Sequence, residues 1–195
     1  MMRTKRTFSQ SSKAVTINVM VASQAWTRAL RSAAAVCRRA AQSALEGTAL
    51  EGAALEALTS RQPLELSILL ATDNAVRKLN ALYRGKDKAT NVLSFPVALD
   101  EKQSFVPAGE PLMLGDIAIA YGVTAREAKA DGKTVAAHLS HLVIHGVLHL
   151  LGYDHEDEKD AVTMERRERK ILARLGISDP YALPTAPPRK ILRRR

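Results

Sequence analysis

The chain concentrates its histidines in one short segment. All five lie between positions 138 and 155, and three of them follow the pattern His145-x-x-x-His149-x-x-Gly152-x-x-His155. Residues four apart in a helix share one face with about 6 Å of axial rise between them, so two such imidazoles can bind one ion at about 2.0 to 2.1 Å. His145 and His149 are therefore predicted to be two ligands of a metal ion.

Gly152 supplies the means to bring in a third ligand. A glycine just past a helix end readily adopts the left-handed conformation that stops the helix and turns the chain back. His155 follows three residues later and can return to the same ion. Three protein ligands leave a fourth position for water, which is typical of catalytic zinc, so we expect one Zn²⁺ ion and no small-molecule cofactor.

Three neighbours of this pattern have other interpretations. His141 lies eight residues from His149, about 12 Å along a helix, so one ion cannot bind both. We interpret His141 as a packing residue or as one that supports a ligand through a hydrogen bond, and His138 as a core or surface residue of the helix. Asp154, beside the third ligand, could orient an imidazole.

The spacing of the three histidines is also similar to that of metzincin proteases. In those enzymes a glutamate directly after the first histidine is the general base, whereas here Gly146 occupies that position. A metal-dependent protease-like hydrolase is therefore only the third interpretation of the site.

Hydrophobic periodicity predicts the elements that position the site. Strands are expected at 15–20, 64–71, 91–95 and 115–120, and helices at 24–45, 73–83, 123–129, 134–151 and 156–175. Without a strict alternation of strands and helices, this order favours an α+β fold. We expect a mixed four-stranded sheet, covered on one main face and packed against about five helices, with the metal site on the long helix 134–151 and the turn after it.

The length of 195 residues fits one domain with tails. The expected domain is a metal-dependent hydrolase over residues 15–183, with a glycine-containing variable surface segment at 46–60. Residues 1–14 are expected to form a disordered basic tail without the apolar core of a secretory signal, and residues 184–195 a Pro-rich basic tail. No stretch approaches the roughly 20 apolar residues that cross a bilayer, so we expect a soluble cytoplasmic protein with no membrane contact.

Charge and cysteine content narrow the function classes. Lys and Arg outnumber Asp and Glu by 29 to 20, a formal net charge of +9, which favours polyanionic partners such as nucleic acid, although part of the excess lies at the chain ends. The single cysteine, Cys37, excludes an intramolecular disulfide and a cysteine-rich zinc site. It is interpreted as a small buried helical residue.

A second cluster of polar residues joins a predicted helix to a predicted strand. Residues 80–96 read NALYRGKDKATNVLSFP, with a basic, glycine-containing turn after Tyr83. Arg84 and the lysines of this turn could bind phosphate. A solvated connection that only caps the helix is the alternative.

Taken together, the segment 80–96, the segment 114–119 (LGDIAI) and the histidine segment 141–155 closely resemble the YbeY family of bacterial rRNA maturation factors. The resemblance extends with gaps from about Leu64 to Tyr181. It implies a zinc-dependent single-strand endoribonuclease that acts in rRNA maturation and ribosome quality control, with rRNA and the small ribosomal subunit as partners. It also places the metal ligands on His145, His149 and His155 and a functionally important, catalytic arginine on Arg84.

Two questions stay open at the level of the sequence. The general base is unassigned, because the glutamate of the metzincins is missing, and a 2′-hydroxyl of the RNA could itself be the nucleophile. The competing function is an RNA-binding ribosome assembly factor whose zinc is mainly structural. The open coordination position favours catalysis over that alternative. The oligomeric state is not predicted.

Overall fold

The computed structural model describes residues 15–49, 63–97, 110–155 and 157–182. Four strands form one mixed sheet in the order β1-β2-β4-β3: β1 (Val15–Val21), β2 (Leu64–Ala71), β3 (Val92–Pro96) and β4 (Leu112–Ala120). β1, β2 and β4 run parallel, and β3 pairs antiparallel with β4 at the edge. The expected mixed four-stranded sheet of an α+β fold is confirmed.

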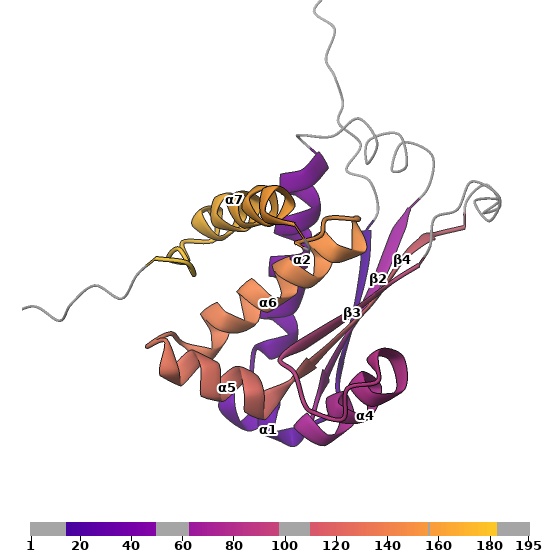
Figure 1. Ribbon diagram of the computed structural model, residues 1–195, viewed down its shortest axis with the longest axis vertical. Helices are drawn as coiled ribbons and strands as arrows, with labels where there is room; N and C mark the ends of the chain where they lie inside the picture. The colour runs from indigo at the N-terminus through magenta and orange to yellow at the C-terminus, as the bar shows by residue number, and fades with distance from the viewer. Residues whose placement is uncertain (1–14, 50–62, 98–109, 156, 183–195) are drawn as a thin grey trace, which may run out of the picture.

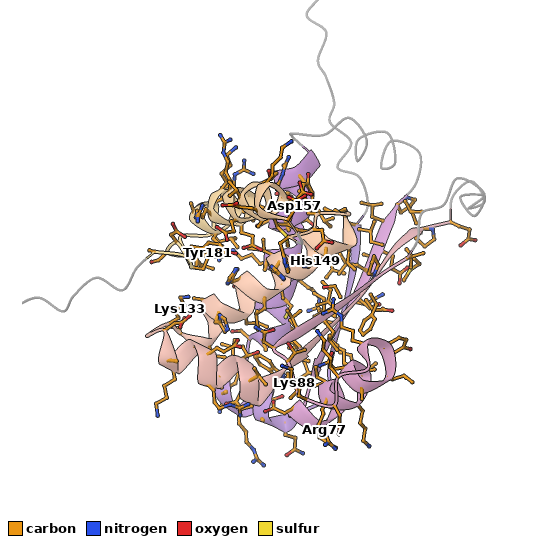
Figure 2. All side chains as sticks on the ribbon, in the orientation of Figure 1. Arg77, Lys88, Lys133, His149, Asp157 and Tyr181 are labelled. Atoms are coloured by element: carbon orange, nitrogen blue, oxygen red, sulfur yellow. The ribbon has the colours of Figure 1, made fainter. Side chains whose placement is uncertain are left out.

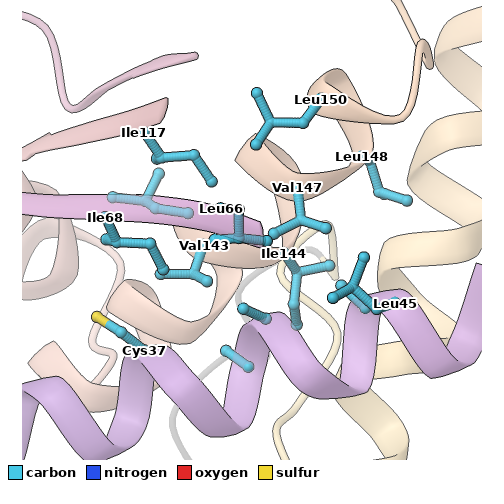
Figure 3. Packing of buried hydrophobic residues seen from close by; sticks show 14 of the residues in the cluster. Cys37, Leu45, Leu66, Ile68, Ile117, Val143, Ile144, Val147, Leu148 and Leu150 are labelled. Atoms are coloured by element: carbon cyan, nitrogen blue, oxygen red, sulfur yellow. The ribbon is translucent and has the colours of Figure 1, made fainter. Parts of the chain in front are cut away.

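Two long helices cover one face of this sheet, and a third packs on both of them (Figure 1). α2 (Ala33–Ala49) and α6 (Val135–Leu150) pack against the strands and against each other, and α7 (Glu158–Arg174) contacts both helices. Strand side chains such as Leu66, Ile68 and Ile117 meet Val143 and Val147 of α6 in the core between these layers (Figure 3). Burying each such side chain contributes about 1.5 to 3 kcal/mol, so α6 is firmly held on the sheet.

The opposite face of the sheet is covered only in part. α4 (Asp73–Arg84) begins directly after β2, with Thr72 as its N-cap, and packs Val76 against Leu93 and Ala118 in a smaller core. α5 (Tyr121–Ala130) follows β4 without a loop and leads to α6. The expectation of one main covered face therefore holds.

The first predicted helix differs from the structure. Instead of one helix over 24–45, α1 (Gln24–Ala29) ends at Leu30, whose backbone is extended, and α2 begins at Ala33. Trp26 of α1 is fully buried and donates from Nε1 to the Ala71 carbonyl at 3.2 Å, whereas α2 packs along α6. These two contacts require different helix directions, so the described residues contain six helices where five were expected.

The end of α2 also differs from the expectation. The helix continues to Ala49, so the first residues of the segment 46–60 are helical, and Gly47 and Thr48 are buried. A Cβ on Gly47 would lie 2.8 Å from Ile171 Cγ1, so glycine lets α2 and α7 approach closely. The rest of that segment and the predicted tails, 1–14 and 184–195, lie outside the described residues. Among the described residues, no helix is both long and apolar enough to cross a membrane.

Candidate metal centre

The C-terminal half of α6 and the turn after it build the site. Thr134 caps the start of the helix by accepting a hydrogen bond from the Ala137 amide at 3.1 Å. At the other end Gly152 has φ +85°, and the amides of Gly152 and Tyr153 donate to the carbonyls of His149 and Leu148. This glycine-dependent cap turns the chain back, as expected from the sequence, and leads to the exposed His155.

Gly146 lets this part of α6 lie directly on the sheet. A Cβ at this position would be 2.9 Å from Ile117 Cδ1 on β4 and 3.2 Å from Ser94 Oγ on β3. Any side chain here would therefore press into the sheet and away from the neighbouring imidazole of His145. The position that holds a glutamate in metzincins is buried against the strands in this fold.

The three histidines converge. Nε2 of His145 lies 3.1 Å from Nε2 of His149, and ligand atoms of His145, His149 and His155 all lie within 4.8 Å of one another. Tetrahedral zinc bonds of about 2.0 to 2.1 Å require nitrogen atoms about 3.3 Å apart, so small side-chain movements bring the set into coordination. His145 and His149 are half-buried and His155 is exposed, so a fourth position can reach solvent.

A fully buried carboxylate supports this set from behind. Glu168 of α7 is 0% exposed, and its Oε1 accepts a hydrogen bond from His145 Nδ1 at 2.8 Å. Its Oε2 accepts from His141 Nε2 at 3.0 Å and from the hydroxyl of Tyr181. His141 thus contacts Glu168 from the turn of α6 before His145.

The electrostatics of the site suit metal binding. Burial, and then the neighbouring His145 and His155, lower the pKa of His149 to about 4, so this imidazole is neutral at neutral pH and offers a lone pair. Burial alone would raise the pKa of Glu168, but the hydrogen bonds from His141 and His145 outweigh it and lower that pKa to about 2. An ionised carboxylate only accepts hydrogen bonds, so His145 carries its proton on Nδ1 and presents Nε2 to an ion.

Asp154 and Arg84, the other two candidate residues, lie differently. Asp154 accepts a hydrogen bond from the backbone amide of His155 at 2.7 Å, so it shapes the turn that carries this histidine. Arg84 is the last residue of α4 and is exposed, and no hydrogen bond or ion pair joins it to the three histidines. Lys88 of the same basic turn is well separated from His149 in Figure 2.

The basic turn nevertheless has a defined shape. Gly85 has φ +67° and ends α4, and the buried Asn80 donates from Nδ2 to the Lys88 carbonyl at 2.8 Å. The turn leads into β3, which contacts α6 and brings Ser94 beside Gly146. Arg84 and the histidines are thus connected through the edge strand.

Comparison with known proteins identifies the family. Residues 15–176 match the model of the family described as Endoribonuclease YbeY. The chain belongs to the YbeY family. It is 48% identical over 167 residues to a Paramagnetospirillum magneticum protein named Endoribonuclease YbeY, an alignment that covers 86% of this chain and 96% of that one. A Rhodopseudomonas palustris protein of the same name is 61% identical over 118 residues, which are 60% of each chain.

The description of the family and the names of these relatives are those of endoribonucleases, which are hydrolases of RNA. A solution structure of a Thermotoga maritima protein is similar to 86% of this chain and 99% of its own, with 20% sequence identity and a TM-score of 0.44. The group of three histidines, which could hold a metal ion, lies within the residues that match this family.

Sequence reasoning missed two polar residues of the site. Glu168 lies in the charged run ERRERK of α7 and looks like one of many solvated charges. Tyr181 lies after α7, outside any periodic segment. A partial signal was present, because position 168 falls at helical spacing with the apolar Met164, Ile171 and Leu172, on the face of α7 that is buried.

Proposed function

We propose that this chain is a zinc-dependent single-strand endoribonuclease of the cytoplasm that acts on rRNA in association with the small ribosomal subunit, in rRNA maturation and ribosome quality control. The observation that carries the proposal is the convergence of imidazole nitrogens from three histidines. His145 and His149 lie one helical turn apart, and His155 follows the glycine cap and is exposed to solvent. Open three-histidine sites are typical of catalytic zinc rather than structural zinc. The family of endoribonucleases supplies the class of reaction.

In this mechanism the chain binds the ion and the substrate with different elements. His145, His149 and His155 would hold the ion. When bound there, zinc supplies Lewis acidity toward a phosphate oxygen and lowers the pKa of water. Arg84, exposed at the end of α4, binds the phosphate charge through its planar guanidinium. The nucleophile is either water or the 2′-hydroxyl of the RNA, and either one must give up a proton to a base that no residue has been assigned to supply.

The position of Gly146 argues against a protease of the metzincin type. The glutamate that such a protease uses as general base would have to occupy a position where even a Cβ lies 2.9 Å from Ile117. The described residues at this site therefore fit phosphodiester chemistry better than peptide hydrolysis by that route.

The test is cleavage of a single-stranded rRNA precursor by the zinc-loaded protein beside two variants prepared in the same way. We expect His149→Ala to abolish cleavage, and Arg84→Ala to reduce kcat/KM by about 100-fold, as loss of one group that stabilises developing charge does. Lys78→Ala is the matched control. Lys78 is another exposed cation of α4, so this substitution removes the same charge as Arg84→Ala.

The outcomes separate the functions. Cleavage lost in His149→Ala, with RNA binding retained, supports the metal-dependent nuclease. Equal cleavage by all four proteins would mean that the activity belongs to a contaminant, and an RNA-binding assembly factor with a mainly structural zinc would then be the better account. Equal losses in Arg84→Ala and Lys78→Ala would show that only net charge matters at α4.

A further inference from the structure

The carboxylate of Glu168 is the most deeply buried charge among the described residues, and all of its hydrogen bonds come from side chains around the three histidines. Its side chain is 0% exposed, and three hydrogen-bond donors surround it: Nδ1 of His145, Nε2 of His141 and the hydroxyl of Tyr181. A buried carboxylate is costly unless such donors satisfy it. Two of these donors lie on α6 and the third lies in the turn after α7, so α6, α7 and this turn must all be in place for the carboxylate to be satisfied.

The direction of these hydrogen bonds fixes a tautomer. Because an ionised carboxylate cannot donate, the ring nitrogens that face it must carry protons. His145 is therefore held with Nδ1 protonated, and its lone pair is on Nε2, the atom that lies 3.1 Å from Nε2 of His149. Carboxylates that accept from the far nitrogen of a ligand histidine both orient the ring and raise its basicity.

Tyr181, which donates to this carboxylate, is held in place by contacts with Asp179 and Arg169. Asp179 accepts from the Tyr181 amide at 2.9 Å and from Arg169 Nε at 3.3 Å, and the Arg169 guanidinium lies 4.8 Å from the Tyr181 ring centre. Lys133 donates to the Pro180 carbonyl at 3.2 Å. Burial and the adjacent Glu168 raise the pKa of Tyr181, so its hydroxyl keeps the proton that it donates.

We propose that Glu168, aligned by Tyr181, is the positioning residue of the metal centre: it holds the His145 imidazole in the Nδ1-protonated form with Nε2 directed at the ion, and thereby sets the affinity for the metal. This role rests on the proposed metal site and assigns a task to two residues outside the group of three histidines. It also explains why the turn 179–181 is fastened to α7 by Arg169.

The variant that tests the proposal is Glu168→Gln. The amide keeps the shape of the side chain but directs an NH₂ group at one of the two imidazole N–H groups, so one hydrogen bond is lost. We expect the affinity for Zn²⁺, measured by competition with a chromogenic chelator, to fall by about 10- to 100-fold. Glu165→Gln is the matched control, because Glu165 lies one turn earlier on α7, is partly exposed and pairs with Arg169 rather than with an imidazole. Its zinc affinity should stay within about two-fold of the wild type.

A second readout needs no metal. In the metal-free protein, the ¹⁵N chemical shifts of the His145 ring report which nitrogen is protonated, and we expect the Nδ1-protonated form in the wild type and in Glu165→Gln, with a mixture of forms in Glu168→Gln. Because neither readout uses RNA, loss of nuclease activity in every protein would contradict the proposed function and leave this inference intact.

Tyr181→Phe keeps the proposal falsifiable if Glu168→Gln fails to fold. The change removes one hydroxyl from a side chain that is 37% exposed, so folding should persist. We expect a loss of zinc affinity that is smaller than that of Glu168→Gln. Wild-type affinity in a folded Glu168→Gln protein, or in Tyr181→Phe when the other variant does not fold, overturns the proposal. An equal loss in Glu165→Gln also overturns it, because a general effect of charge on α7 would then explain the result.

Discussion

The two halves of α6 each pair a histidine with a carboxylate, yet only one half builds a site for chemistry. In the first half, Nε2 of the buried His138 lies 2.8 Å from Oε2 of Glu127, which also accepts from Nδ2 of Asn91. In the second half, His145 has a similar bond to Glu168. The difference is on the far side of each ring: Nδ1 of His138 is buried without a hydrogen-bond partner, whereas Nε2 of His145 faces His149.

This comparison shows what a histidine and carboxylate pair means by itself. The pair near Asn91 joins α5, α6 and the start of β3, because Asn91 also accepts from the Val92 amide at 2.7 Å. It therefore stabilises the fold. The pair at Glu168 belongs to a group that could hold a metal ion, because ligand atoms of His149 and His155 lie close to the second ring nitrogen of His145. Convergence of ligands, rather than a single hydrogen bond, distinguishes the two.

The largest expected effect comes from removing a ligand. His149→Ala should lower zinc affinity by more than about 100-fold, since a lost ligand costs more than a lost supporting hydrogen bond. The bound metal per chain after dialysis against a weak chelator measures this effect. A variant that retains one tightly bound ion would mean that the three histidines are not the metal site.

The matching change in the first half should affect stability alone. His138→Ala removes a buried ring and its hydrogen bond to Glu127, and we expect the free energy of unfolding to fall by about 1 to 3 kcal/mol. Zinc affinity should be unchanged. Urea denaturation of the metal-free protein measures the loss, and a large decrease in zinc affinity would end the distinction between the two halves.

A smaller effect is expected at the contact between α6 and the sheet. Gly146→Ala places a Cβ 2.9 Å from Ile117 Cδ1, and overpacking of this kind costs about 1 to 3 kcal/mol, offset by the roughly 1 kcal/mol that alanine contributes in a helix. We expect a net destabilisation of about 1 kcal/mol by thermal or urea denaturation. A clear stabilisation would show that α6 does not lie against β4 at this glycine.

The smallest effect concerns Cys37, which is fully buried in the main core. Burial raises the pKa of its thiol to about 12, although Arg38 acts in the opposite direction. Below that pH the folded protein therefore contains almost no thiolate at this position. We expect iodoacetamide at pH 8 to label the chain only after unfolding, as measured by mass spectrometry, and rapid labelling of the native protein would contradict this packing.

The elements that could be predicted from the sequence are those with a strong local pattern. The alternation in 64–71 gave β2 with its observed bounds, and the pattern of histidines and Gly152 gave the end of α6 and the turn to His155. These features depend on neighbours in the chain. The break between α1 and α2 has no such signal, because neither Gly nor Pro marks it. It depends instead on a tertiary contact, the burial of Trp26 and its hydrogen bond to the Ala71 carbonyl.

The supporting residues of the site could not be predicted for the same reason. Glu168 and Tyr181 acquire their roles only when α7 packs on α6 and the turn 179–181 folds back. The sequence instead suggested Asp154, which is adjacent to a ligand in the chain but bonds a backbone amide. Proximity along the chain predicted that the three histidines lie together, and tertiary packing determined which residues hydrogen-bond to them.

The most direct test of the metal centre is a zinc titration of the chelator-stripped protein, with cleavage of a single-stranded rRNA precursor followed in the same samples. The account predicts no cleavage without metal, a rise that reaches a plateau at about one ion per chain, and no rise for His149→Ala. Cleavage that is independent of added zinc, or equal in His149→Ala, would contradict it.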